Sequence, residues 1–248
     1  MPNLILYNYT MSICSMKTRL AMAEFGLDFE DRQVDIGFAL ENFEPDYVKL
    51  NRRGVVPTLV ADNEVTTNSA EIVKRLAHIS GLGLSQDGAA RETALNWFHR
   101  GDGLNFQVIT YGRKGVPRGD ELLVARRERA ALYADRFPDL RDVYLEIHDR
   151  IVNHAAGAVD AQGLAKADKD LRDTLDALDE QLEGQAFIVG EHYSITDVMW
   201  TVILARVEML GLASEIKDRP RVLAYYEAMK RRPSFETARV MPNWKGGI

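Results

Sequence analysis

One short segment, residues 51–59, constrains the fold of this chain more than any other: it reads Asn-Arg-Arg-Gly-Val-Val-Pro-Thr-Leu. A turn signal of Asn and Gly leads directly into an apolar strand, and Pro57 stands where that strand begins. Because proline has no N–H for a strand ladder, it belongs at a sheet edge, at a strand start or after a cis bond. A cis Val56-Pro57 bond would turn the backbone N–H and C=O of Val56 outward, where they could pair with an extended peptide.

A predicted helix start follows this strand closely. Asn68 and Ser69 are typical N-cap residues, and Glu71 lies three residues after Asn68, in capping-box register. The free N–H groups at such a helix start form a site for a carboxylate. A peptide-binding edge beside a carboxylate site indicates a ligand that is a small acidic peptide.

The pattern Asn-x-x-Gly-x-Val-Pro-x-Leu, followed by a serine that opens a helix, resembles the glutathione site of the glutathione transferase family. Two more segments are similar to the family. In residues 187–197, Ser194 and Asp197 stand in capping-box relation ahead of an apolar run, and residues 221–235 end in Arg-Pro-Ser-Phe. The simpler interpretation of the first pattern is a hairpin turn and a helix cap in another α/β domain. The order and spacing of the three segments favour the family, and the resemblance implies glutathione as co-substrate.

The chain divides at Gly81-Leu82-Gly83, which is typical of a linker. Residues 1–80 predict the order β-α-β-α-β-β-α, with strands at 4–7, 29–34, 58–60 and 64–66 and helices at 15–25 and 68–78. Residues 86–248 predict long amphipathic helices, at 90–111, 120–137, 140–156, 165–182, 193–210 and 221–230. The predicted fold class is α+β/α with two domains, and the resemblance implies a thioredoxin-like N-terminal domain followed by an all-α helical bundle.

A charged insertion is expected around residues 112–141, between two helices of the bundle. Basic residues are frequent there, at Arg113, Lys114, Arg118, Arg126, Arg127 and Arg129. Acidic residues are interleaved with them, so the sequence favours a solvated face over a functional basic patch.

Composition excludes several classes of function. The net charge of −6 argues against a nucleic-acid partner, because a surface that follows phosphates is usually basic. No apolar run reaches the roughly eighteen residues of a membrane-spanning helix, and the N-terminus lacks the pattern of a signal peptide. The single cysteine, Cys14, excludes an internal disulfide framework and an all-cysteine metal site. We expect a cytoplasmic protein without a bound metal and without a membrane partner.

The turn after the first strand carries the candidate reactive groups. If glutathione is the ligand, its own sulfur reacts, and the protein must hold that sulfur as a thiolate. A free thiol has a pKa of about 8.5, and lowering it by about two units takes about 2.7 kcal/mol. One hydroxyl hydrogen bond to the anion supplies most of this free energy. A Ser, Tyr or Cys is therefore expected in this turn.

Three residues of the turn compete for that role. Counted without gaps from Gly26, Ser12 falls where serine-type and zeta-like members of the family keep their hydroxyl. Cys14 falls where beta-class members keep a cysteine, and Ser15 where some aryl-ether-cleaving members keep a serine. We favour Ser12 and then Ser15, although the simplest role of either serine is a helix cap. For Cys14 the favoured interpretation is a small buried residue.

The resemblance also implies how the peptide is held. Val56 would pair its backbone with the cysteinyl part of glutathione, and Pro57 would fix that loop. Ser69 would bind the γ-glutamyl carboxylate. The residue before this serine is usually acidic, to meet the ammonium of the ligand, and here it is Asn68. A carboxylate from elsewhere, such as a partner subunit, would then have to compensate.

Further residues are expected around the ligands. Lys49 and Arg52 are candidates for the glycyl carboxylate of glutathione. The electrophile pocket would lie between the domains, and its candidate lining residues are Met11, Trp97, Phe106 and Tyr111. A methionine and aromatic lining suits an apolar aromatic substrate.

The sequence therefore predicts a bacterial-type glutathione transferase that directs the thiolate onto a hydrophobic, aromatic electrophile. Conjugation, isomerisation and cleavage of a lignin-like β-aryl ether all begin with this thiolate and stay open. Two alternatives remain: a thiol-transferase that works through Cys14, and a non-catalytic protein of the same fold that acts in protein association. The resemblance also implies a dimer, of identical chains or with a related transferase chain.

Overall fold

A small mixed sheet forms the N-terminal part of the chain. The computed structural model describes residues 2–83, 88–113, 119–158 and 161–241. Its strands are β1 (Leu4–Asn8), β2 (Glu30–Gln33), β3 (Thr58–Ala61) and β4 (Glu64–Thr66), in the spatial order β2-β1-β3-β4. β1 is parallel to β2 and antiparallel to β3, and β3 and β4 form the expected hairpin. The four predicted strands are confirmed, with ends that differ by at most one residue.

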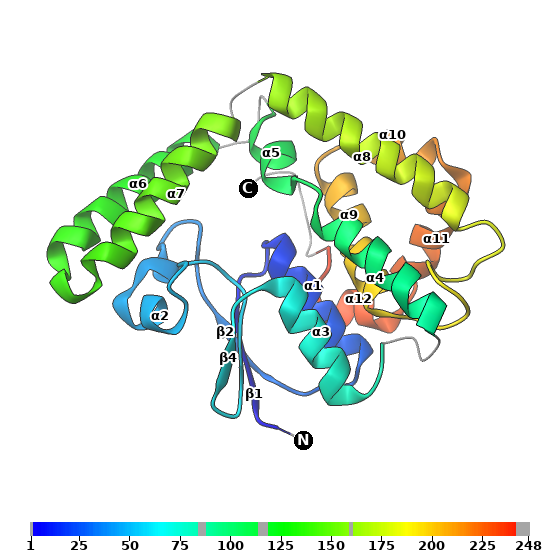
Figure 1. Cartoon of the computed structure of the whole chain (residues 1–248), viewed down its shortest axis with the longest axis horizontal. Coiled ribbons are helices and arrows are strands. Elements are labelled where there is room, and N and C mark those ends of the chain that lie inside the picture. The colour runs from blue at the N-terminus through cyan, green and yellow to red at the C-terminus, as the bar shows by residue number, and fades with distance from the viewer. Residues whose placement is uncertain (1, 84–87, 114–118, 159–160, 242–248) are drawn as a thin grey trace.

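Helices cover both faces of this sheet. They are α1 (Ile13–Glu24), the short 3-10 helix η1 (Glu41–Phe43), α2 (Pro45–Leu50) and α3 (Ser69–Ser80). Figure 1 shows α1 and α3 on the side that faces the later helices, with α2 on the opposite side. This arrangement confirms the thioredoxin-like domain.

Every described element after residue 87 is helical, which confirms the second half of the predicted fold class. The helices are α4 (Gly88–Asp102), α5 (Phe106–Tyr111), α6 (Gly119–Arg136), η2 (Pro138–Leu140), α7 (Arg141–Ala158), α8 (Ala161–Gln181), α9 (Ile195–Met209), α10 (Ala213–Lys217), α11 (Pro220–Lys230) and α12 (Pro233–Thr237). None of the helices in the described ranges is long and apolar enough to cross a membrane.

The single helix expected over 90–111 is in fact two, α4 and α5. The first ends where Gly103 N–H bonds to the His99 carbonyl at 2.9 Å, and Asn105 caps the second by accepting from Val108 N–H at 3.1 Å. Gly101 packs against α9 so closely that an added Cβ would lie 2.9 Å from Ile203 Cδ1. Because of this break, α5 lies near the N-terminal end of α1 (Figure 1).

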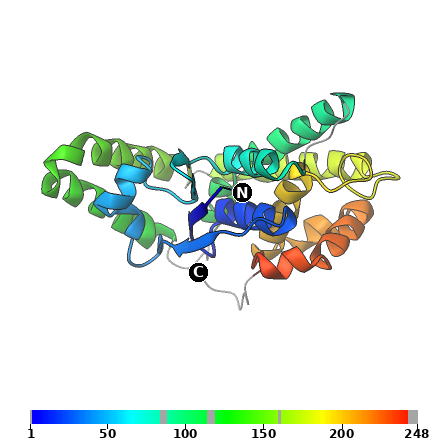
Figure 2. The same cartoon turned by 90° about the horizontal axis from the view of Figure 1, so that it is seen from below.

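Most of the charged segment 112–141 forms α6, which pairs with α7 in a helical hairpin that lies apart from α8–α12 and next to α2 (Figures 1 and 2). Its buried side chains, among them Tyr144 and Ile147, pack on Leu40 and Phe43 of the N-terminal domain. Tyr144 also donates a 2.7 Å hydrogen bond to the Phe43 carbonyl.

The solvated face that the sequence favours covers only part of this insertion, since Arg127 is exposed but Arg126 and Arg129 are partly buried. Arg126 donates to the Ile36 carbonyl at 2.7 Å, and Arg129 to the Ala39 carbonyl at 3.2 Å. These arginines therefore anchor the hairpin to the loop after β2. Lys114 and Arg118 lie outside the described residues.

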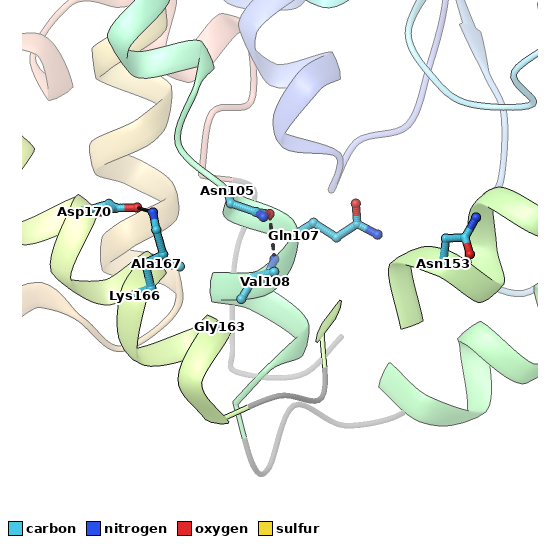
Figure 3. Close-up of a pocket in the computed structure, with 8 residues that line it drawn as sticks. All are labelled: Asn105, Gln107, Val108, Asn153, Gly163, Lys166, Ala167 and Asp170. Carbon is cyan, nitrogen blue, oxygen red and sulfur yellow. Dashed lines mark hydrogen bonds and ion pairs between the residues drawn. The ribbon is translucent and has the colours of Figure 1, made fainter. Parts of the chain in front are cut away.

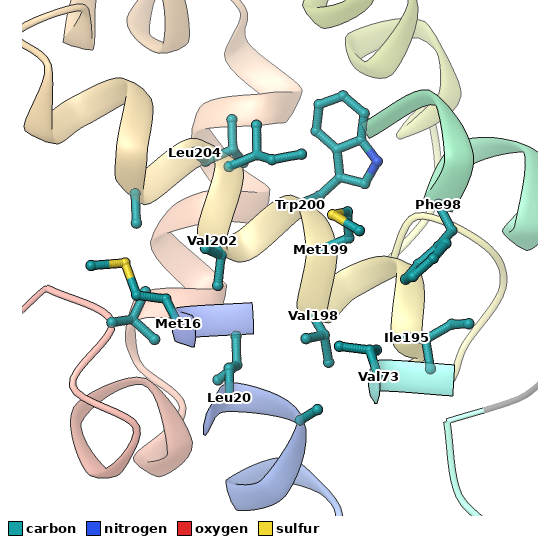
Figure 4. Close-up of a cluster of buried hydrophobic side chains, with 14 of the residues drawn as sticks. Met16, Leu20, Val73, Phe98, Ile195, Val198, Met199, Trp200, Val202 and Leu204 are labelled. Atoms are coloured by element: carbon teal, nitrogen blue, oxygen red, sulfur yellow. The ribbon is translucent and has the colours of Figure 1, made fainter. Parts of the chain in front are cut away.

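The main core is built around α9, whose residues are buried almost all round. Figure 4 shows Trp200, Met199 and Val198 of α9 between side chains of α1, α3 and α4. Trp200 Nε1–H donates to the Trp97 carbonyl at 3.0 Å, and the Thr196 hydroxyl donates to the Ala94 carbonyl at 2.7 Å. α9 thus holds α4 and the thioredoxin-like domain in one packed unit.

A buried carboxylate fixes the start of α9, as the capping-box pattern predicts. Asp197 has no solvent exposure and accepts from Ile188 N–H (3.0 Å), Ser194 N–H (2.8 Å), the Ser194 hydroxyl (2.9 Å) and the Tyr225 hydroxyl (3.0 Å). Burial raises the pKa of Asp197, and these hydrogen bonds oppose that shift. The carboxylate joins the loop before α9, α9 itself and α11 (residues 220–230).

Removing this carboxylate should destabilise the whole chain. Asp197→Ala leaves buried donors without an acceptor, and we expect it to lower the free energy of unfolding by about 3 kcal/mol or more. Urea unfolding followed by circular dichroism measures the change. Asp218→Ala is the matched control, because Asp218 is exposed and its loss should change stability by less than about 0.5 kcal/mol. Equal effects of the two substitutions would contradict this account of α9.

Candidate functional site

A cavity of about 550 Å³ lies between the thioredoxin-like domain and the helices that follow it. Its walls come from the first turn of α1, the loop before β3, the start of α3, the α4–α5 break, the α6–α7 hairpin and α9. Three of the segments that the sequence singled out, around Ser12, Val56 and Ser69, therefore meet in one place.

The loop before β3 is shaped by buried polar side chains. The Val56-Pro57 peptide bond is cis, as expected. The Asn51 amide and the Tyr47 hydroxyl each donate to the Val55 carbonyl at 2.7 Å. Among the described residues, neither the N–H nor the C=O of Val56 has a hydrogen-bond partner. This backbone unit, which lines the cavity, is free to pair with a ligand.

Gly54 in the same loop combines a left-handed backbone conformation with a close contact to a neighbouring segment. Its φ is +55°, which other residues adopt only with strain, and an added Cβ would lie 3.2 Å from the Asn42 carbonyl oxygen. The Asn42 amide in turn donates to the Gly54 carbonyl at 2.7 Å. The glycine therefore lets the loop lie close against η1, and this contact holds Val56 at the cavity wall.

Asn68 stands where the family usually has an acidic residue, and it still caps α3. Asn68 is the N-cap, and its side-chain oxygen accepts from Ala70 N–H at 2.8 Å and from Glu71 N–H at 3.2 Å. This oxygen is engaged by the backbone and is not free for a ligand ammonium. Ser69 follows at the cavity wall, where the helix start favours a bound carboxylate.

The three candidates of the first turn occupy different environments. Ser12 caps α1, accepting from Ser15 N–H at 3.3 Å, and lines the cavity. Ser15 is fully buried, does not line the cavity, and accepts from Tyr9 N–H at 3.2 Å. Cys14 is half-buried and lines the cavity. Ser12 and Cys14 thus line the cavity and Ser15 lies behind them. The position of Ser12 agrees with the preference from the sequence, whereas Cys14 is better placed than Ser15.

Neither cation expected at the glycyl carboxylate lines the cavity. Lys49 pairs with Asp46 at 3.2 Å on the surface, and the exposed Arg52 points elsewhere. The neighbouring residue Arg53 is the one in the wall. The sequence pattern indicated this turn, and of its two adjacent arginines Arg53 lines the cavity and Arg52 does not.

The cavity wall is basic although the chain is acidic. The described lining residues include four arginines and one lysine, but a single carboxylate, Asp102. The arginines and the lysine are Arg53, Arg126, Arg150, Arg206 and Lys17. Lys17 is buried and pairs with Asp102 at 3.4 Å. The excess of positive charge suits anionic ligands.

The apolar lining agrees with the expected one except for Trp97. Met11, Phe106 and Tyr111 lie in the wall. Trp97 is instead core: its ring packs edge-on against Trp200 with centroids 5.8 Å apart. It belongs to the face of α4 that contacts α9, so helical periodicity alone could not assign it to the cavity.

Sequence reasoning missed two notable residues of the wall. Tyr9 follows β1, and burial and the Asp35 carboxylate raise its pKa, so its hydroxyl stays protonated at neutral pH. Arg206 lies on α9, in a run of apolar residues. Because a charged residue is unusual inside an apolar run, this pattern could have indicated from the sequence that Arg206 has a special role.

A second, smaller cavity of about 300 Å³ lies between α5, α7 and α8 (Figure 3). Lys166 and Asp170 pair across one turn of α8 at 2.6 Å at its edge. Its lining includes the start of α5 at Asn105 but no thiol. No cluster of three or more potential metal ligands occurs among the residues that the structure describes.

Comparison with known proteins agrees with this geometry. Residues 11–79 match the family model described as glutathione S-transferase, N-terminal domain, and residues 156–228 match the C-terminal domain model. A tetrachloro-p-hydroquinone reductive dehalogenase of Sphingobium chlorophenolicum is 62% identical over 248 residues, 100% of both chains. A glutathione S-transferase of Arabidopsis thaliana, TCHQD, is 24% identical over 93% of this chain and 87% of its own.

Solved structures share the fold at low sequence identity. The β-etherase LigF of Sphingobium sp. strain SYK-6 aligns with a TM-score of 0.74 at 19% identity, covering 95% of this chain and 98% of its own. A theta-class glutathione S-transferase of Xanthomonas axonopodis pv. citri, solved with glutathione bound, aligns with a TM-score of 0.69 at 20% identity, covering 97% and 98%. Glutathione is the co-substrate of this family, and the chain belongs to the glutathione transferase family.

Proposed function

We propose that this protein is a glutathione-dependent reductive dehalogenase of halogenated hydroquinones. The observation that carries the proposal is the position of Cys14: the chain's single cysteine lines the same cavity as Ser12, the free backbone of Val56 and Ser69. The full-length relative at 62% identity, a tetrachloro-p-hydroquinone reductive dehalogenase, supports the substrate class. The apolar wall of Met11, Phe106 and Tyr111 suits a chlorinated ring.

Ser12 is proposed to hold the glutathione sulfur as a thiolate. Its oxygen already accepts from Ser15 N–H, so its own O–H is available to donate to the ligand. The start of α1 adds a favourable dipole. Val56 and Ser69 would bind the peptide backbone and the γ-glutamyl carboxylate, as the sequence predicts. Arg53 is the proposed partner of the glycyl carboxylate in place of Lys49 and Arg52.

Replacement of chlorine by hydrogen needs two electrons, which two thiols can supply. In the first step the glutathione thiolate attacks a ring carbon, a C–S bond forms, and chloride leaves. In the second step the Cys14 thiolate attacks the sulfur of the conjugate, an S–S bond forms, and the ring carbon takes the electron pair of the broken C–S bond and then a proton. A second glutathione thiolate then attacks the mixed disulfide, which releases Cys14 and glutathione disulfide.

The other functions considered from the sequence rank lower. Simple conjugation would need Ser12 alone and would leave the placement of Cys14 without a use. The structural similarity to a β-etherase, at 19% identity, speaks for the fold only. A non-catalytic role in protein association would not require a cavity whose wall holds a thiol and a free peptide backbone.

We also expect the chain to form a dimer and to reside in the cytoplasm. Apolar side chains exposed on α6 and α7, such as Leu132 and Val152, offer surface for an interface. A dimer of this chain, or one with a related transferase chain, agrees with the family. Sedimentation velocity distinguishes these assemblies from a monomer.

Replacing the cysteine should stop the reaction after its first step. With Cys14→Ser, glutathione and tetrachlorohydroquinone, we expect the aryl–glutathione conjugate to accumulate and the dehalogenated hydroquinone to be absent. Liquid chromatography with mass spectrometry measures both products. The wild-type protein should give dehalogenated product and one glutathione disulfide per chloride released. Unchanged formation of dehalogenated product by Cys14→Ser would reject the role of the cysteine.

Substitutions of the two serines should change different quantities: the rate of conjugate formation for Ser12 and the free energy of unfolding for Ser15. Ser12→Ala should slow conjugate formation by about tenfold or more, because the thiolate loses a hydrogen bond. Ser15→Ala should instead lower the free energy of unfolding by about 1–2 kcal/mol, because Tyr9 N–H loses its buried acceptor. Stopped-flow absorbance and urea unfolding give the two quantities, and calorimetric titration gives glutathione affinity. If Ser15→Ala slows conjugate formation without loss of stability, Ser15 and not Ser12 would be the thiolate-binding serine. An absence of glutathione binding in the wild type would favour the non-catalytic alternative.

A further inference from the structure

Arg206 is a buried cation without a counter-charge. It lies near the end of α9, and 4% of its surface is exposed. Its guanidinium donates to the Met11 carbonyl at 2.5 Å, and its Nε has no hydrogen-bond partner. Among the described residues, no carboxylate lies within ion-pair distance of it. A buried charge in this state is costly, so its retention in an apolar helix requires an explanation.

The other buried arginines of the chain are satisfied. Arg19 donates to the Ala238 and Thr10 carbonyls at 2.9 Å each and to the Asn8 side chain at 2.8 Å. Arg219 pairs with Asp176 at 2.7 Å and also with Glu215. Arg206 differs from Arg19 and Arg219 because it lines the cavity. Arg126 lines the cavity too and also has an Nε without a hydrogen-bond partner, but it is only partly buried.

The surroundings of Arg206 place it at the electrophile side of that cavity. Burial is the largest influence on its pKa and lowers it, and Tyr111 and Cys14 line the same cavity as the guanidinium. Met11, the acceptor of its hydrogen bond, belongs to the apolar wall. The groups proposed to bind the glutathione backbone, Val56 and Ser69, belong to other segments of the wall. The carboxylate in the lining, Asp102, is already paired with Lys17.

We propose that Arg206 binds the ionised ring hydroxyl of the aromatic substrate and, with Tyr111, forms the anion subsite for the electrophile. This proposal deepens the proposed function and rests on it for the substrate class. Halogens withdraw electrons from the ring, so a polyhalogenated phenol is an anion at neutral pH. A phenolate supplies the charge and the acceptor that the guanidinium lacks, and charge-assisted hydrogen bonds of this kind are strong.

This placement also orients the reaction. In a polyhalogenated hydroquinone, the carbon next to the hydroxyl carries a halogen. With the phenolate oxygen on Arg206, that neighbouring carbon would stay within the cavity that Cys14 also lines. The residue thus selects substrates with an ionised hydroxyl and presents the adjacent carbon to the sulfur atoms.

The affinities of two ligands that share one ring and differ in charge test this subsite, and the measurement does not require the enzyme to catalyse its reaction. Pentachlorophenol is ionised at neutral pH, and its methyl ether, pentachloroanisole, has the same ring without the charge. Isothermal titration without glutathione should show that the wild-type protein binds the phenol about tenfold or more tightly than the ether. Arg206→Met should lose this preference, and Arg206→Lys should keep part of it because the charge remains. Equal affinity of the wild type for the two ligands would overturn the proposal.

Two controls keep the result interpretable. Arg100→Met removes the same charge from an exposed position of α4 outside the cavity and should bind the phenol as the wild type does. Circular dichroism verifies that each variant is folded. If Arg206→Met does not fold, the test is the comparison of the affinities of the wild type and of Arg206→Lys for the phenol and the ether. Unchanged phenol affinity in folded Arg206→Met would also overturn the proposal. If phenol binding depends on Arg206 but no dehalogenation occurs, the reaction is wrong and the anion subsite stands.

Discussion

The rest of the structure depends on the burial of α9 and on the carboxylate that fixes its start. Asp197 holds the preceding loop, the first turn of α9 and Tyr225 of α11 through four hydrogen bonds. From this fixed start, α9 carries Trp200 to α4 and, near its end, Arg206 to the first turn of α1. One helix therefore sets both the distance between the domains and the floor of the cavity that lies between them.

The cavity combines two kinds of recognition. The thioredoxin-like domain offers backbone groups, at Val56 and at the start of α3, which suit the backbone and one terminal carboxylate of a peptide. The helical domain offers charge and apolar surface, through Arg206, Phe106 and Tyr111. A chain with a net charge of −6 concentrates positive charge at this one place, where an anionic peptide and an anionic ring would both be held. The half-buried thiol of Cys14 lines the same cavity.

Local patterns were enough to predict much of this architecture. The cis-proline loop, the Asn68 cap of α3 and the capping box of α9 each depend on residues a few positions apart, and all three are confirmed. Features that depend on the direction of a side chain were not predictable in this way. Arg53 lines the cavity although the sequence suggested Arg52, and Trp97 packs in the core, because periodicity does not tell which of two neighbouring side chains faces the cavity. Arg206 and the docking of Arg126 depend on contacts between distant segments, which a single sequence does not reveal.

The central claim is that the sulfur of Cys14 and the sulfur of glutathione meet in this cavity during the reaction. Intact-protein mass spectrometry of the enzyme, quenched with acid during turnover of tetrachlorohydroquinone, tests this most directly. Since the chain has one cysteine, any disulfide-linked adduct is on Cys14. The account predicts a protein species heavier by one glutathionyl group, which a reducing agent removes. Steady dehalogenation with only unmodified protein at every quench time would contradict it.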